Sequence, residues 1–97
     1  MTRKELILRL CTESDELTIK LLHDFPTLVR DLRAIEDYEE AYRQYQHKKI
    51  HAKRQWSRDL ILDRYGIGVN TFYEIRKRVE WVLNIVDKAL SARNLNF

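Results

Sequence analysis

Glycine and proline are so scarce in this sequence that long helices are the main structure open to it. The 97 residues contain two glycines and one proline. Chains rich in strands need frequent tight turns, which depend on these residue types, so a turn-rich β fold is disfavoured. Hydrophobic residues make up 44% of the chain and charged residues 34%, as in a charge-rich helical protein. The sequence therefore predicts an all-α fold of four or five helices.

Local signals predict two short helices at the N-terminus. The stretch TRKE, residues 2–5, has the spacing of a capping box, which predicts a helix over about 3–11. Thr12 or Ser14 can start a second helix, which we expect to end near His23.

The middle and last helices are expected to be long. Pro26 suits a first helical turn, and neither glycine nor proline occurs again before Gly66. An apolar stripe with helical steps then turns from aliphatic to tyrosine, at Leu28, Leu32, Ile35, Tyr38, Tyr42 and Tyr45. A further helix near 56–65 would be closed by Gly66 in a left-handed conformation, and the last helix covers roughly 69–92. Whether the middle helix ends, bends or continues within 46–56 is left open.

Charge is distributed unevenly along the chain. Residues 1–40 carry six Lys or Arg and ten Asp or Glu, a net charge of −4, whereas residues 41–97 carry twelve and five, a net charge of +7. Residues 41–58 contain six basic residues and no acidic one. This pattern favours a polyanionic partner, and the alternative is the solvated face of a charge-rich helix.

Both glycines stand in the stretch YGIGVNTFYEIRKR, residues 65–78. Two helices that cross at a turn of three or four residues often need a glycine there, because positive φ is costly for other residues. Gly66 stands at that place. Apolar residues occupy the positions that would wedge two such helices together: Ile61, Tyr65, Ile67, Phe72 and Ile75. The alternative is a purely structural helical hairpin.

The segment RDLILDRYGIGVNTFYEIRKR, residues 58–78, resembles the helix-turn-helix superfamily of DNA-binding proteins. It looks like the motif found in resolvase-like, sigma-factor-like and phage small-terminase proteins, although Gly68 stands where a capping Ser or Thr is common. The resemblance divides an expected single domain, 1–97, into an N-terminal helical part, 1–55, and a helix-turn-helix with an extended last helix, 56–92.

The resemblance implies which residues contact DNA. Outward-facing residues of the second helix would read bases in the major groove: Val69, Asn70, Tyr73, Glu74 and Lys77. Basic residues around the motif would bind phosphates: Lys48, Lys49, Lys53, Arg54, Arg58, Arg76 and Arg78. The expected function is that of a small intracellular DNA-binding protein in transcription or in phage or mobile-element DNA handling, with double-stranded DNA as its partner.

The apolar pattern of the last helix continues beyond Arg78, which indicates a homodimer interface. The expected seam consists of Val79, Val82, Val86 and Ala89, and it is widened by Trp81, Leu83, Ile85 and Leu90. A dimer would present two reading helices to two half-sites of DNA. The alternative is that the N-terminal helices cover these residues within one chain.

Other chemistry is not expected. The sequence has no phosphate loop, paired-carboxylate motif or metal signature, so we predict no enzyme, no cofactor and no small-molecule ligand. His47 and His51 have helical metal-ligand spacing but no third ligand nearby. The three tyrosines of the middle helix are expected to pack between helices rather than to stack on bases, and Cys11 is expected to be buried.

No apolar run approaches the roughly 20 residues that cross a bilayer, and no signal peptide is evident at the N-terminus. We therefore expect no membrane partner and a cytoplasmic location. The second function to consider is a helical scaffold or interaction module that self-associates and binds no nucleic acid.

Overall fold

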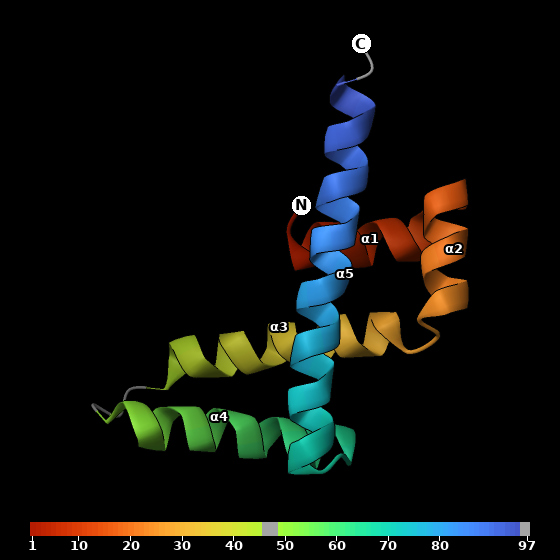
Figure 1. The fold of residues 1–97 in the computed structure, drawn as a ribbon. Coiled ribbons are helices and arrows are strands. Elements are labelled where there is room, and N and C mark those ends of the chain that lie inside the picture. Colours follow the sequence, from red (N-terminus) through yellow and green to blue (C-terminus); the bar gives the residue numbers. More distant parts are fainter. Residues whose placement is uncertain (46–48, 96–97) are drawn as a thin grey trace.

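The computed structural model describes residues 1–45 and 49–95, and within these ranges the chain forms five α-helices and no strand (Figure 1). The helices are α1 (Arg3–Thr12), α2 (Glu16–Asp24), α3 (Leu28–Gln44), α4 (Ile50–Tyr65) and α5 (Val69–Leu95). The all-α prediction is confirmed, and the middle and last helices are long, as expected.

Side-chain caps fix the starts of the first two helices. Thr2 and Glu5 form the expected capping box, in which each side chain accepts a hydrogen bond from the other residue's backbone N–H. Asp15, rather than either residue expected from the sequence, caps α2 by accepting from the Thr18 N–H at 2.8 Å. This backbone hydrogen bond, and then the Arg9 guanidinium, hold the pKa of Asp15 well below its usual range.

Two helix boundaries differ from the sequence expectation. Pro26 lies in a turn before α3 rather than in its first helical turn. The Leu28 N–H closes this turn by donating to the Phe25 carbonyl at 3.0 Å, and α3 begins at Leu28. α4 begins at Ile50, about two turns before the expected start near residue 56. No glycine or proline interrupts that stretch, and Tyr45 stacks on the Trp56 ring at 4.8 Å between centroids, which fixes the register of α4 against α3.

The helices form two groups, α1 with α2 and α3 with α4, which meet where α1 packs on α3, and α5 spans both. α3 and α4 run antiparallel as a hairpin, and α5 crosses that hairpin rather than lying alongside it (Figure 1). α5 then continues past α1 and α2, and the C-terminal end of the chain lies at its far end (Figure 1). The crossing leaves the outward side of the first turns of α5 uncovered by α3 and α4.

A single apolar core joins all five helices. Its fully buried members include Leu6 of α1, Leu32 of α3, Ile61 of α4 and Phe72 of α5, each at most 1% exposed. Leu21 of α2, 5% exposed, belongs to the same cluster. The short N-terminal helices α1 and α2 therefore pack in the same core as α4 and α5.

The same core accounts for the apolar stripe of α5, and it corrects the dimer-seam prediction. Val79, Val82 and Val86 are at most 1% exposed within one chain, and Ala89 is half-buried. These valines pack in the cluster that contains Leu6 and residues of α2 and α3, so they are not free to meet a second copy. The alternative, that the N-terminal helices cover them, holds for the three valines.

Cys11 is exposed, which corrects the expectation that it is buried. α1 turns Leu6 and Leu10 toward the core and leaves Cys11 on its solvent side. Within residues 1–45 and 49–95, no helix is both long and apolar enough to cross a membrane.

Candidate nucleic-acid interface

The connection between α4 and α5 is three residues long and depends on Gly66. Gly66 has φ +62° and ψ +40°, the left-handed conformation that the sequence predicted. Its N–H and that of Ile67 both donate to the Leu62 carbonyl, which would otherwise lack a partner at the end of α4. α5 begins immediately afterwards, with the Phe72 N–H donating to the Gly68 carbonyl at 3.0 Å.

The five apolar positions expected around the turn do pack together. Ile61, Phe72 and Ile75 are at most 1% exposed, and Tyr65 and Ile67 are half-buried against the same core. The Tyr65 hydroxyl also donates a 2.6 Å hydrogen bond to the Asp37 carboxylate of α3. Burial, and then this carboxylate, raise the pKa of Tyr65 to about 12. The end of α4 is thereby fixed to α3.

The expected base-reading residues all lie at the surface of the first turns of α5. Asn70, Glu74 and Lys77 are exposed, and the side chains of Val69 and Tyr73 are 40% and 43% exposed. Trp81 is 59% exposed and follows Lys77 by one helical turn, so it extends the same stripe. The sequence pattern placed Trp81 beside the dimer seam. Its spacing of four residues from Lys77 could have assigned it to this exposed face instead.

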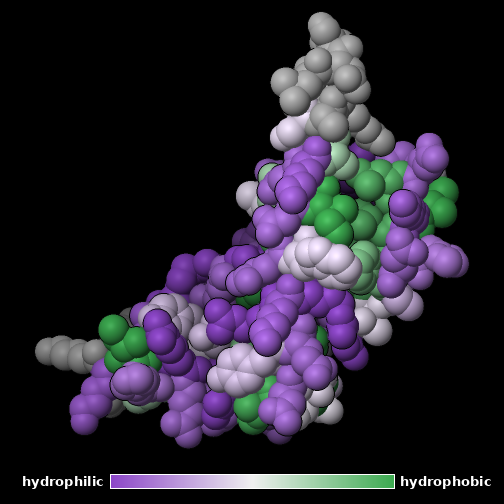
Figure 2. All heavy atoms as spheres, viewed as in Figure 1, coloured by the Kyte–Doolittle hydropathy of each residue, from purple (hydrophilic) through white to green (hydrophobic). Residues whose placement is uncertain are grey.

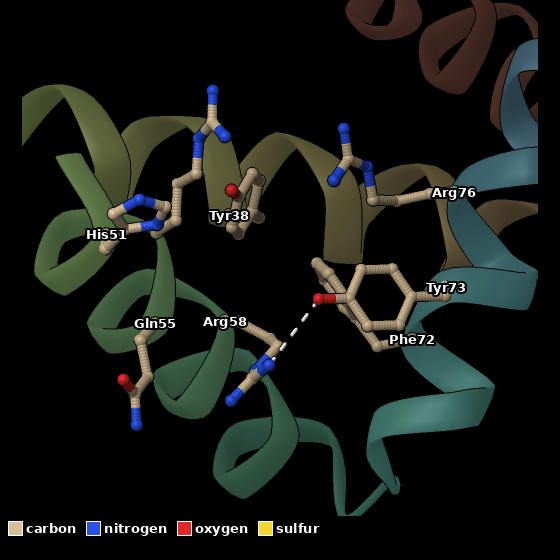
Figure 3. Close-up of a pocket in the computed structure, with 8 residues that line it drawn as sticks. Tyr38, His51, Gln55, Arg58, Phe72, Tyr73 and Arg76 are labelled. Carbon is tan, nitrogen blue, oxygen red and sulfur yellow. Dashed lines mark hydrogen bonds between the residues drawn. The ribbon is translucent and has the colours of Figure 1, made fainter.

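A basic cleft lies beside this face, in the corner where α5 crosses the α3–α4 hairpin (Figure 3). Its volume is about 690 Å³. α3, α4 and α5 together supply its lining, which we call the basic cleft: Tyr38, His51, Arg54, Gln55, Arg58, Phe72, Tyr73 and Arg76. Tyr73 belongs both to the cleft and to the exposed face of α5, so the two surfaces are continuous.

The cleft is cationic because its lining, among the described residues, includes three arginines and no carboxylate. Among the side chains that the structure describes, those of residues 1–45 and 49–91, Arg54 and Arg76 form no ion pair. The Arg76 guanidinium lies over the Tyr38 ring at 5.7 Å from its centroid. These two guanidinium groups can therefore bind an anion without first breaking an ion pair.

Arg58 is held in place from both sides. Its Nη2 lies 3.1 Å from the Asp59 carboxylate, and its Nη1 lies 3.5 Å from the Tyr73 hydroxyl, which is a long contact for a hydrogen bond (Figure 3). The Tyr73 hydroxyl and then Asp59 raise the pKa of the Arg58 guanidinium above its ordinary value. The ion pair with Asp59 and the long contact with Tyr73 together keep the Arg58 guanidinium directed toward Tyr73.

The other expected phosphate-binding residues are placed differently. Lys53 has its ammonium group 4.2 Å from the centroid of the Tyr42 ring, and Lys49 is exposed immediately before α4. Lys48 lies outside the described residues, as does His47. His51 lines the cleft, and the described residues contain no group of three or more side chains that could hold a metal ion.

Arg78 does not face the basic cleft, which corrects its assignment to the phosphate-binding group. Its Nη1 donates a 2.9 Å hydrogen bond to Asp31, which is fully buried on α3. Asp31 also accepts from Arg30 at 2.9 Å and from the Thr27 hydroxyl at 3.0 Å. A buried carboxylate requires such partners. Arg78 is one of them, and its pairing with Asp31 links α5 to α3.

Tyr38 of α3 and Tyr45, which directly follows α3, pack between helices, as expected. Tyr38 contacts the Phe72 ring of α5 at 5.3 Å between centroids, and Tyr45 stacks on Trp56 of α4. Tyr38 nevertheless also lines the basic cleft. The sequence predicted none of three lining residues, Tyr38, His51 and Gln55, as part of a binding surface. On α4 a usable signal existed, since residues 51, 54, 55 and 58 share one helical face.

Comparison with protein-family models, with curated proteins and with solved structures finds no match for this chain. The resemblance of residues 58–78 to helix-turn-helix proteins therefore stays a prediction.

Proposed function

We propose that this protein binds double-stranded DNA, with the first turns of α5 in the major groove. The observation that carries the proposal is the continuity of two surfaces, the exposed face of α5 and the basic cleft, through Tyr73. A cationic surface next to a projecting helix suits a duplex, because phosphates flank the major groove on either side.

The arrangement of the helices supports this mode of binding. The major groove is about 12 Å wide and admits one α-helix, provided that its outer side is uncovered. α5 crosses the α3–α4 hairpin, so its outward residues face away from the core (Figure 1). The three-residue turn and the buried side chains beneath it hold α5 at a fixed position relative to α4.

Each exposed side chain of α5 suits a different base contact. Asn70 can pair with both N6 and N7 of an adenine, and Lys77 can donate to the acceptors of a guanine. Glu74 can accept from the amino group of a cytosine, while Val69 can contact a thymine methyl group. Arg54, Arg58, Arg76 and the lysines at the start of α4 would contact phosphates, which positions the helix without reading sequence.

The proposal is tested by separating residues that recognise bases from residues that bind only phosphates. A preferred duplex is first selected from a random pool, and its dissociation constant is then compared with that of an unrelated duplex. Asn70→Ala should cost roughly 1–3 kcal/mol on the preferred duplex only, whereas Arg76→Gln should weaken both duplexes alike.

Arg64→Gln is the matched control, since it removes the same charge from α4 outside the cleft, where Arg64 pairs with Asp37 at 3.4 Å. If Asn70→Ala and Arg76→Gln weaken both duplexes by the same factor, α5 does not read bases.

The resemblance to helix-turn-helix proteins is the reason to propose a process as well. We place the function in transcriptional regulation or in the handling of phage or mobile-element DNA, and the protein in the cytoplasm. Binding of chromosomal targets by chromatin immunoprecipitation would separate regulation from the other two roles.

A second candidate function, self-association as a scaffold, is favoured by exposed apolar residues. Leu8 of α1, Ile19 of α2 and Trp81 of α5 are 64%, 58% and 59% exposed. Figure 2 shows apolar side chains gathered over α2 and the neighbouring part of α5. Sedimentation at micromolar concentration tests this function, because a scaffold should be oligomeric and Ile19→Lys with Trp81→Lys should make it monomeric. A monomeric wild type excludes it at that concentration.

A further inference from the structure

We propose that the basic cleft also binds a single unpaired nucleotide, with its phosphates on Arg54, Arg58 and Arg76 and its base against Tyr73. This inference goes beyond duplex reading. It uses the same arginines as the proposed function, but it does not require α5 to enter a groove.

The size of the cleft is the first reason. Sites for ligands the size of a nucleotide occupy roughly 300–1,000 Å³, and this cleft has a volume of about 690 Å³. A base that is paired and stacked in a duplex stays with its neighbours and cannot enter a concave site unless it leaves the stack.

The distribution of charge is the second reason. Three guanidinium groups from two helices surround one space, without a carboxylate in the lining. Guanidinium groups bind phosphate oxygens through two parallel hydrogen bonds, which a single point charge cannot do. Arg54 and Arg76 have no ion pair in the described structure to lose, so the cleft offers more positive charge than one phosphodiester group neutralises.

The aromatic side of the cleft is the third reason. The Tyr73 ring is 43% exposed, and its neighbour Phe72 contacts it edge-on at 5.5 Å between centroids. The Tyr38 ring is less available, because Arg76 lies over it and Phe72 packs against it. Tyr73 therefore provides the stacking surface for a base, as aromatic residues do in proteins that bind single strands.

The groups proposed to bind the phosphates and the base lie next to each other. The Tyr73 hydroxyl lies 3.5 Å from Arg58 Nη1, so a phosphate-binding group and the stacking ring are adjacent (Figure 3). His51 and Gln55 line the α4 side of the same space and can form hydrogen bonds with a base or a sugar (Figure 3).

The unpaired nucleotide can have two sources, a free nucleotide or the end of a DNA strand. Titration calorimetry of the full chain with ATP, in the absence of divalent cations, tests the first. Anisotropy with a 5′-phosphorylated hairpin duplex that carries one unpaired nucleotide, compared with the same blunt duplex, tests the second. Binding of ATP, or tighter binding of the overhang than of the blunt duplex, supports the proposal and identifies the source. Absence of both overturns it.

Variants test the assignment of residues. Tyr73→Ala should weaken binding of the nucleotide about tenfold and weaken binding of inorganic tripolyphosphate less, because Arg58 loses only its long contact with the Tyr73 hydroxyl. Arg76→Gln should weaken both, and Arg64→Gln should weaken neither. Equal losses for Arg76→Gln and Arg64→Gln would mean that only overall charge matters, and an unaltered nucleotide affinity in Tyr73→Ala would remove the base site. Both outcomes overturn the proposal, provided that circular dichroism shows each variant to be helical.

The two proposals can fail separately in these experiments. If ATP binds but no duplex binds, the cleft binds nucleotides and the proposed function is wrong. If the blunt duplex binds but neither ATP nor the overhang gives the expected result, the proposed function stands and this inference fails.

Discussion

Replacing Gly66 by serine should destabilise the fold by an amount that the structure defines. A Cβ at this position would have no heavy atom within 4 Å, so no steric clash contributes. The cost is the backbone cost of φ +62°, about 1–2 kcal/mol for a residue with a side chain. In a domain of this size each kcal/mol lowers the melting temperature by about 4–8 °C, and thermal unfolding followed by circular dichroism resolves such a change.

Gly68→Ser is the matched control for this experiment. A Cβ at Gly68 would also have no heavy atom within 4 Å, but the φ of Gly68 is not in the left-handed region. Serine at the start of a helix can cap it, so this variant should keep or slightly raise the melting temperature. An unchanged melting temperature in Gly66→Ser, or equal decreases in both variants, would refute the role assigned to the turn.

Three further predictions concern residues whose roles the structure separates. Arg78→Gln should lower the free energy of unfolding by about 1.5–3 kcal/mol, because it removes a hydrogen bond to a buried carboxylate, and it should leave DNA affinity unchanged. Arg76→Gln should lower DNA affinity and leave the free energy of unfolding unchanged. Urea unfolding measures the stability, and anisotropy measures the affinity. Because the pKa of Tyr65 is raised from 10.0 to about 12 by folding, its stabilising contribution is present below pH 10 and is lost as the pH rises through about 12, so Tyr65→Phe should show a smaller decrease in stability over that interval. Val82→Glu together with Val86→Glu should unfold the chain, as judged by loss of helical dichroism, since both valines are fully buried; a folded double variant would contradict their place in the core.

Features that depend on local chemistry were predictable from the sequence. The capping box at residues 2–5 and the left-handed Gly66 involve only neighbouring residues, and helical periodicity locates the buried face of α5. The five apolar positions around the turn followed from the same periodicity, because a residue's place on a helix decides which side it can bury.

Features that depend on distant parts of the chain were not predictable. The buried Asp31 of α3 lies 47 residues from Arg78, and only the fold shows that it pairs with this arginine. The valines of α5 have the pattern of an interface, but a pattern does not tell whether the covering helices belong to the same chain. The cleft is formed by three helices, so its shape and its Tyr38 lining appear only when the crossing of α5 is known.

The claim that the basic cleft and α5 bind duplex DNA is tested most directly by the salt dependence of binding. The affinity of the full chain for a blunt random duplex should be measured by anisotropy between about 50 and about 200 mM salt. Each neutralised phosphate contributes about −0.9 to the slope of log K against log salt concentration, so contacts from Arg54, Arg58 and Arg76 predict a slope of about −3 or steeper, reduced by about one in Arg76→Gln. No binding at the lower salt concentration, or a slope that Arg76→Gln leaves unchanged, would contradict this function.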